Sequence, residues 1–317
     1  MLVSILIPAY NSERFVAETL RSALAQTVED KEIIVVDDGS ADGTPAVLRS
    51  FGSAIRCEFG PNRGASAARN RATALAQGRY LQYLDADDLL EPDAVAKRIA
   101  ALEQTGADVA YADWQRLQEQ ADGSFAPGEI EARDIAEVHA DPELATFASF
   151  WSPPAALLYS RRIVDRIGRW NESLPVIQDA RFLQDAAICG ARFVRVAGVG
   201  ARYRVHRERS LSTRNPIAFA RDVLRNSSDI QSIWESRGPL AADQRTALAS
   251  SLDFVCRQLF FADLPGFRRA LSGLYHLQPG FRLTWPKVAG AAASLFGHAV
   301  ATDLMRRIDA RRPGRSE

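Results

Sequence analysis

The sequence predicts an α/β fold with a mostly parallel sheet, followed by a helical C-terminal region. Short apolar runs alternate with segments of helical periodicity up to about residue 110, which is the pattern of successive βαβ units. Parallel sheets built this way are covered by helices on both faces. From Asn215 onward the pattern is helical to the end of the 317 residues.

The expected strands are short and mostly β-branched or aromatic. The first intervening helix is expected after a candidate N-cap at Ser12, because apolar residues recur every fourth position from Val16. A later helix is expected after Pro92. The strands are Val3–Ile7, Glu32–Val36, Ile55–Phe59, Tyr80–Leu84 and Asp108–Tyr111.

The middle of the chain is less regular. Residues 112–150 lose the periodicity, and Gln118 to Gly128 has the mixed Gly, Pro and Asp composition of a loop. A second structured block is expected from Ala156 to about Val205. It contains a helix near Gln178–Cys189 and strands at Phe193–Val196 and Ala201–Val205.

Charge and cysteine content exclude several classes of protein. The 39 basic and 39 acidic residues cancel, so no overall field draws the chain to nucleic acid. The three cysteines lie far apart, which argues against a zinc knuckle or a disulfide scaffold and favours a reducing compartment. Met1 to Pro8 lacks the basic start of a signal peptide, and no apolar stretch reaches the roughly 18 residues of a membrane span. We therefore expect a cytoplasmic location.

Polar and acidic residues follow four of the expected strands. In parallel sheets, ligands bind beyond the carboxyl ends of the strands. Carboxylates there suit Mg²⁺ or Mn²⁺, and such a metal can hold a diphosphate. Singly, these segments are typical of turns, helix caps or solvated helix faces; their occurrence at successive strand ends favours a nucleotide site. The segments are Pro8-Ala9-Tyr10-Asn11, Asp37-Asp38-Gly39-Ser40, Asn62-Arg63-Gly64 with Arg69-Asn70, and Asp85-Ala86-Asp87-Asp88.

In order and spacing, these segments resemble the nucleotide-binding half of family 2 glycosyltransferases over residues 1 to 113. The resemblance implies a GT-A fold and a metal-dependent, inverting enzyme. It assigns the base and ribose of a sugar nucleotide to Pro8, Ala9, Tyr10 and Asp38, and the metal and donor to the Asp-x-Asp of Asp85 and Asp87. The full set expected to bind substrate is Pro8, Ala9, Tyr10, Asn11, Asp37, Asp38, Arg63, Arg69, Asp85 and Ala86.

A second part of the chain is similar to the acceptor side of that family. The segments that carry this similarity are 151–159 and 167–172, followed by Gln178-Asp179. The family has Glu-Asp at this place, with the Asp as general base, so the resemblance makes Asp179 the catalytic base and Gln178 a departure. His206 lies where some members supply a histidine to the metal. Taken alone, Asp179 also suits a helix cap or first-turn acid, and His206 an ordinary core or surface position.

The expected function is transfer of a sugar from a UDP- or GDP-sugar type donor to a hydroxyl acceptor, with Mn²⁺ or Mg²⁺ as cofactor. The acceptor would be a glycan or a lipid-linked molecule in cell-surface polysaccharide or glycolipid synthesis. Two alternatives remain open: a catalytically silent nucleotide- or glycan-binding protein, and a sugar nucleotidyltransferase. The latter requires a Gly-rich phosphate loop where this chain has Pro8 to Asn11.

The expected domains are a catalytic domain, 1–214, and a helical region, 215–317. The catalytic domain would comprise a nucleotide-sugar half, 1–113, and an acceptor half, 114–214. The tail contains Phe281, Trp285, an Ala-rich segment and terminal arginines. It suits either a helical bundle or peripheral attachment to the cytoplasmic face of a membrane, with arginines on anionic lipid.

Overall fold

The computed structural model describes residues 1–207 and 215–281. Its contacts divide the chain into two units, Met1–Ser210 and Leu211–Glu317. Both this division and the expected domain boundary at residue 214 fall beside or within 208–214, outside the described residues, so the boundary stays a prediction.

The first unit is built on a sheet with the order β3-β2-β1-β4-β8-β6-β9-β5, and β7 pairs with β6. Its N-terminal part is parallel and comprises β1 (Val3–Ala9), β2 (Lys31–Asp38), β3 (Arg56–Gly60) and β4 (Tyr80–Tyr83). β1 lies at the centre because its apolar residues are buried on both faces. The predicted α/β class and all five predicted strands are confirmed, since β6 (Val109–Glu119) contains the fifth.

The second half of the sheet mixes strand directions. β6 and β9 (Phe193–Val205) are parallel, whereas β8 (Leu157–Ser160) is antiparallel to both β4 and β6. β5 (Leu89–Leu90) adds a short antiparallel edge. The two segments expected at 193–196 and 201–205 are one strand, which is irregular opposite Ala112 and Asp113.

The expectation of an irregular segment at 112–150 is wrong. β6 continues to Glu119 and turns into β7 (Phe125–Glu131), and two short helices follow, α5 (Ile135–Val138) and α6 (Pro142–Ala148). The outer part of this hairpin is exposed on most of its surface and mixes polar residues with apolar ones such as Ala126 and Ile130, so it shows no apolar alternation. β6 also passes through residue 113, so the two expected halves share a strand.

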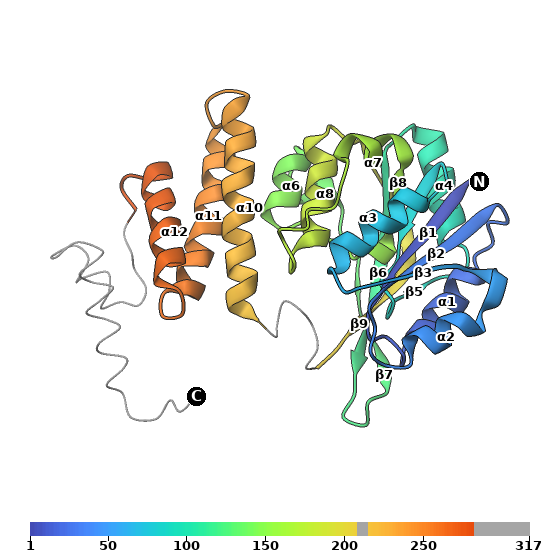
Figure 1. Ribbon diagram of the computed structural model, residues 1–317. Helices are drawn as coiled ribbons and strands as arrows, with labels where there is room; N and C mark the ends of the chain where they lie inside the picture. The colour runs from blue at the N-terminus through green and yellow to red at the C-terminus, as the bar shows by residue number, and fades with distance from the viewer. Residues whose placement is uncertain (208–214, 282–317) are drawn as a thin grey trace, which may run out of the picture. The chain divides into compact units, whose positions relative to one another are not determined.

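Helices cover both faces of the sheet (Figure 1). One core lies under α1 (Val16–Leu24), α2 (Thr44–Ser50) and α4 (Ala94–Thr105). The other lies under α3 (Ala65–Leu75), α7 (Arg161–Ile167) and α8 (Gln178–Ile188). Short 3-10 turns occur at η1 (Gly52–Ala54) and η2 (Pro154–Ala156).

Ser12 is not the N-cap of α1, contrary to the prediction. The helix begins at Val16 with Phe15 in the cap position and no side-chain cap. Instead, the Ser12 carbonyl accepts hydrogen bonds from the Phe15 and Val16 amides, both at 2.9 Å. Its hydroxyl donates to the carbonyl of Tyr10. Ser12 therefore shapes the loop that enters the helix.

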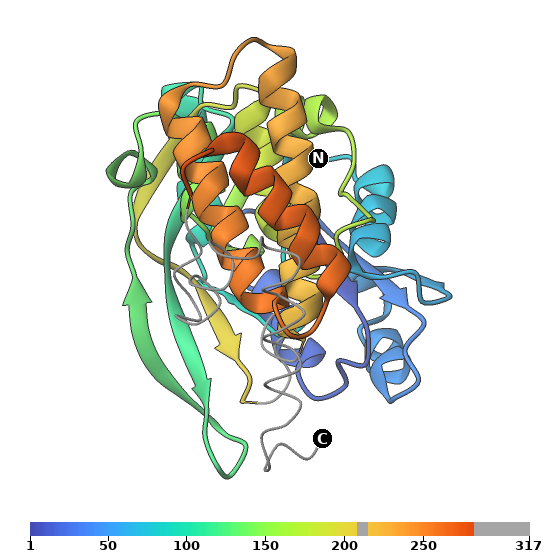
Figure 2. The same ribbon diagram turned by 90° about the vertical axis from the view of Figure 1, so that its left-hand side faces the viewer.

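The second unit packs three helices side by side: α10 (Pro216–Ser236), α11 (Ala242–Leu259) and α12 (Leu264–Leu277) (Figure 2). Asn215 caps α10 and Asp263 caps α12, each by accepting a backbone N–H. In the described residues, no helix is both long and apolar enough to cross a bilayer. Trp285, the Ala-rich segment and the terminal arginines lie outside the described residues.

Candidate active site

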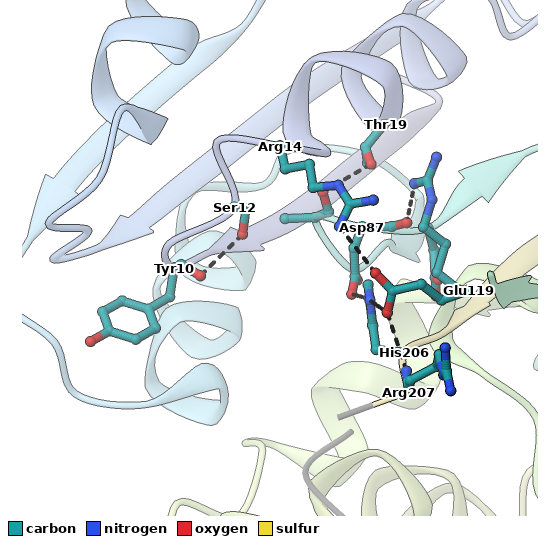
Figure 3. Close-up of polar contacts among 11 residues, drawn as sticks. Tyr10, Ser12, Arg14, Thr19, Asp87, Glu119, His206 and Arg207 are labelled. Carbon is teal, nitrogen blue, oxygen red and sulfur yellow. Dashed lines mark hydrogen bonds and ion pairs between the residues drawn. The ribbon is translucent and has the colours of Figure 1, made fainter. Parts of the chain in front are cut away.

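The loops after β1 and β2 are bound to each other by hydrogen bonds. The Asn11 side-chain oxygen accepts from the Ala41 backbone amide at 2.8 Å, and the Asn11 backbone amide donates to Ser40 Oγ at 2.9 Å. Asn11 has φ 47°, a left-handed conformation that Asn tolerates better than most residues. Tyr10, the residue before Asn11, is 51% exposed, and its ring points away from Asp87 and Glu119 (Figure 3).

The two aspartates at the end of β2 hold adjacent loops. Asp38 accepts from the backbone amides of Arg63 and Gly64, both at 2.8 Å, and Asp37 accepts from the Ser40 hydroxyl at 2.5 Å. The residue after Asp38 must be glycine. Gly39 has φ +76°, and a Cβ added there would lie 2.6 Å from the Asn62 backbone nitrogen of the neighbouring loop. Both aspartates are thus positioning groups for the loops of the site.

A groove of about 580 Å³ opens beside these aspartates. Asp37, Asp38 and Arg63 line it, together with part of α3 and with Gly168, Arg169 and Glu172. The Arg63 side chain is exposed and directed to this groove. Two other predicted residues differ: the side chains of Ala9 and Ala86 are 1% and 6% exposed and belong to the core. Pro8, next to Ala9, lies within β1.

Arg69 is a buried cation with free donor groups. Its side chain is 3% exposed, its Nη2 donates to Asp85 Oδ1, and its guanidinium lies 4.5 Å from the Trp170 ring centroid. Its Nε and Nη1 are buried without a hydrogen-bond partner. Since buried donors normally have partners, these two groups suit an anionic ligand such as a phosphate.

Three carboxylates crowd the loop after β4. Burial raises the pKa of Asp85; Arg69 opposes this rise, and the charges of Asp87 and Asp179 add to it. Burial also raises the pKa of Asp88 well above its usual value, and the charges of Asp87 and Asp85 raise it further. Burial and the neighbouring carboxylates thus both disfavour the ionised forms of Asp85 and Asp88.

His206 reaches this loop from the end of β9. Its Nε2 lies 2.9 Å from Asp87 Oδ2 and its Nδ1 lies 3.7 Å from Glu119 Oε2 (Figure 3). The imidazole packs beside the rings of Phe15 and Phe125. Two of the three predicted metal ligands, Asp87 and His206, are therefore in contact.

The third predicted ligand, Asp85, pairs with Arg69. Among the described residues, no three His, Cys, Asp or Glu side chains are grouped as a metal site would require. The donor atoms nevertheless suit a divalent cation: His206 Nε2 faces Asp87, and Asp88 Oδ2 is buried without a hydrogen-bond partner beside mutually repelling carboxylates.

Arg204 is a buried residue of the site that the sequence did not reveal. Its guanidinium donates to the Asp87 carbonyl and to Glu18, and its backbone amide donates to Asp88 Oδ1 at 2.9 Å. It lies between the rings of Phe15 and Phe125, at 5.1 and 5.3 Å from their centroids. Arg204 fixes the acidic loop to β9.

We expect Arg204→Met to lower the free energy of unfolding by about 1.5–3 kcal/mol, the worth of hydrogen bonds to a charged group. Urea denaturation measures this change. Arg202→Met is the matched control, because Arg202 lies on the same strand, is 44% exposed and pairs with Glu91; its loss should be below about 1 kcal/mol. Equal losses in the two variants would contradict the assigned role.

Asp179 lies in the first turn of α8 but does not cap the helix. Ile177 occupies the cap position, without a side-chain hydrogen bond. The carboxylate instead accepts from Trp151 Nε1 at 2.9 Å. Trp151 packs edge-to-face against Trp114 and Tyr203, with centroids 5.5 and 5.6 Å apart. An indole held by two other rings thus orients Asp179.

Gln178 occupies the position where the resembling family has Glu. With the amide oriented to satisfy its surroundings, its nitrogen donates to the carbonyls of Pro175 and Leu174. An ionised Glu would have no proton to donate to these two acceptors. Local hydrogen bonding therefore accounts for the glutamine.

A family model, described as glycosyl transferase family 2, matches residues 4–137. These residues form a family 2 glycosyl transferase domain. The match covers the loops after β1, β2 and β4, which contain most of the predicted substrate-binding residues. Asp179 and His206 lie beyond it.

Sequence relatives of this chain include proteins of polysaccharide synthesis. The succinoglycan biosynthesis protein ExoO of Rhizobium meliloti is 28% identical over 86% of this chain and 75% of its own length. Chondroitin synthase of Escherichia coli is 44% identical over 30% of this chain, which is 14% of that protein. The chain thus spans well under two thirds of the length of several curated relatives that it matches.

Solved structures share the fold. A fragment of S. aureus TarS in complex with UDP-GlcNAc matches all of this chain and 94% of its own, with a TM-score of 0.67 and 18% identity. The mannosyltransferase PcManGT of Pyrobaculum calidifontis, in complex with GDP-Man and Mn²⁺, matches 97% of this chain and 87% of its own, with a TM-score of 0.56 and 18% identity. At this identity the similarity establishes the GT-A type fold, as predicted.

Proposed function

We propose that this protein transfers a sugar from a nucleoside-diphosphate sugar to a hydroxyl acceptor, with inversion at the anomeric carbon. The observation that carries the proposal is the buried Arg69, which pairs with Asp85 of the acidic loop and keeps its Nε and Nη1 free for a phosphate. The charge of Asp179 acts on the same Asp85. A base, a donor-binding loop and a cation for phosphate thus share one edge of the sheet. That edge is where ligands of parallel sheets bind.

Donor binding rests on the loops after β1, β2 and β4. The exposed Tyr10 ring and the groove at Asp37, Asp38 and Arg63 suit the nucleoside, and the free Nε and Nη1 of Arg69 suit the diphosphate. The comparison proteins were solved with UDP-GlcNAc and with GDP-Man, which supports a UDP- or GDP-sugar as donor.

Asp179 would act as the general base. Its carboxylate accepts the proton of the acceptor hydroxyl while the hydroxyl oxygen bonds to the anomeric carbon and the bond from that carbon to the diphosphate breaks. A single displacement of this kind inverts the anomeric configuration and leaves no sugar on the enzyme. Trp151 holds one carboxylate oxygen, which leaves the other for the proton.

A divalent cation, Mn²⁺ or Mg²⁺, would be held by Asp85, Asp87 and His206. When bound, such a cation supplies Lewis-acid neutralisation of the charge on the departing diphosphate. The crowding of Asp85, Asp87 and Asp88 and the 2.9 Å approach of His206 Nε2 to Asp87 Oδ2 support this assignment. The presence of Mn²⁺ in the PcManGT complex supports it further.

Thermal unfolding with added ligand tests donor binding. With Mn²⁺ present, UDP or GDP should stabilise the protein by about 2.7 kcal/mol at a concentration of 100 Kd, because ligands of the native state raise its stability. Stabilisation by neither nucleotide would contradict the proposal. Nucleotide binding without metal-dependent donor hydrolysis would favour the silent binding protein.

We expect the acceptor to be a glycan or lipid-linked molecule of surface polysaccharide synthesis, as the names of ExoO and chondroitin synthase suggest for those relatives.

A peripheral membrane role for the tail predicts flotation of the full chain with anionic liposomes. Replacing the arginines at 306, 307, 311 and 312 by glutamine should reduce flotation. No flotation of the unaltered chain would contradict the membrane role.

A further inference from the structure

A small cavity opens where β6 changes its pairing partner. β6 pairs with β8 through Tyr111 and with β7 from Trp114 onward, so residues 112 and 113 lack a neighbouring strand on that side. Residues 149–152 approach β6 at this gap. The resulting cavity has a volume of about 190 Å³. That is below the roughly 300–1,000 Å³ of sites for drug-sized ligands, so it suits a ligand of one ring.

The cavity combines aromatic walls with polar groups. Trp114 and Trp151 line it, and so does the ion pair of Arg116 Nη2 with Glu131 Oε1 at 2.7 Å. The hydroxyl of Ser152, a residue only 4% exposed, is buried in this wall without a hydrogen-bond partner. Because buried polar groups are nearly always paired, this hydroxyl requires a partner from a ligand or from water.

The cavity shares one residue, Trp151, with the surroundings of the proposed base, Asp179. Trp151 lines it, and the indole Nε1 of the same residue donates to Asp179 at 2.9 Å. A molecule held against Trp151 would therefore be separated from the proposed base by one indole ring.

We propose that this cavity binds one pyranose ring of a glycan acceptor, an inference that rests on the proposed transferase function. The C–H groups of a sugar ring pack against aromatic walls, and its hydroxyls bond to an ion pair and to an unpaired hydroxyl. A lipid chain offers no such bonds and would leave Ser152 Oγ buried without a partner. The chemistry of the walls thus selects carbohydrate over lipid at this subsite.

The test follows the tryptophan indole N–H resonances of the ¹⁵N-labelled full chain. The probes are methyl glycosides of glucose, galactose, mannose and N-acetylglucosamine in both anomeric forms, with n-octanol as the apolar probe. We expect at least one glycoside to shift the Trp114 and Trp151 signals saturably at millimolar concentration, with the Trp234 signal unmoved. Shifts by octanol alone, or by no probe, would overturn the proposal.

Two serine variants serve as a matched pair. Ser149 is exposed at the rim of the cavity, so Ser149→Phe should block the cavity and abolish the glycoside shifts; Ser53→Phe, in η1, should leave them unchanged. Glycoside shifts that persist in Ser149→Phe would place the sugar elsewhere and overturn the assignment. Titration with UDP or GDP on the same samples separates this result from failure of donor binding, which would count against the transferase function instead.

Discussion

Asp179→Asn should lower single-turnover sugar transfer by about 10²–10⁴-fold, the usual worth of a positioned general base. The amide oxygen of Asn can still accept the hydrogen bond from Trp151, so the shape of the site should be preserved. Donor affinity should therefore remain near that of the unaltered protein, and the loss should appear in the chemical step. Rapid-quench transfer at saturating donor, together with calorimetric donor affinity, measures both quantities.

The matched control for Asp179→Asn is Asp165→Asn, which removes an exposed carboxylate of the neighbouring α7. It should transfer normally. Near-normal transfer by Asp179→Asn would remove this residue from the mechanism. Loss of donor binding in the same variant would reassign Asp179 to the nucleotide site.

Asp87→Ala should weaken nucleoside diphosphate binding in the presence of Mn²⁺ by about 10–100-fold or more. Loss of a residue that only hydrogen-bonds to a metal ligand already costs about 10–100-fold in metal affinity. The substitution removes a predicted metal ligand and also the partner of His206 Nε2. Diphosphate beside unscreened carboxylates is repelled, so excess chelator should have the same effect on the unaltered protein. Calorimetric titration with UDP and GDP measures the affinity.

Asp30→Ala is the matched control for Asp87→Ala. Its carboxylate lies just before β2, at the opposite ends of the parallel strands, and is 62% exposed. It should bind nucleotide normally. Unchanged affinity in both Asp87→Ala and excess chelator would contradict metal-dependent donor binding.

The parallel half of the fold could be predicted because its signal is local. Buried parallel strands are short apolar runs, and β1 and β2 show this pattern with helical periodicity between them. The hairpin of β6 and β7 could not be predicted in this way. β7 is largely exposed and its apolar residues do not alternate with polar ones, so no strand pattern marks it. The loop composition at Gln118 to Gly128 marks only the turn between the two strands.

The residues of the site also divide into those marked by local sequence and those brought together only by tertiary contacts. Asp87, His206 and Asp179 were predicted because they stand in recognisable segments at element ends, and Asp87 and His206 do meet. Arg204 was missed because one arginine among many carries no signal of its burial between Phe15 and Phe125, which come from distant segments. The pairing of Asp85 with Arg69 is likewise a tertiary contact that spacing does not reveal.

The most direct test of the central claim is cleavage of the donor by water in place of the acceptor. The full chain with Mn²⁺ is incubated with a panel of UDP- and GDP-sugars, and the first sugar released is followed by ¹H NMR before its anomers equilibrate. We predict release from at least one donor with inverted anomeric configuration, at a rate that falls about 10²–10⁴-fold in Asp179→Asn. Release with retained configuration, or no release above that of Asp179→Asn from any donor, would contradict it.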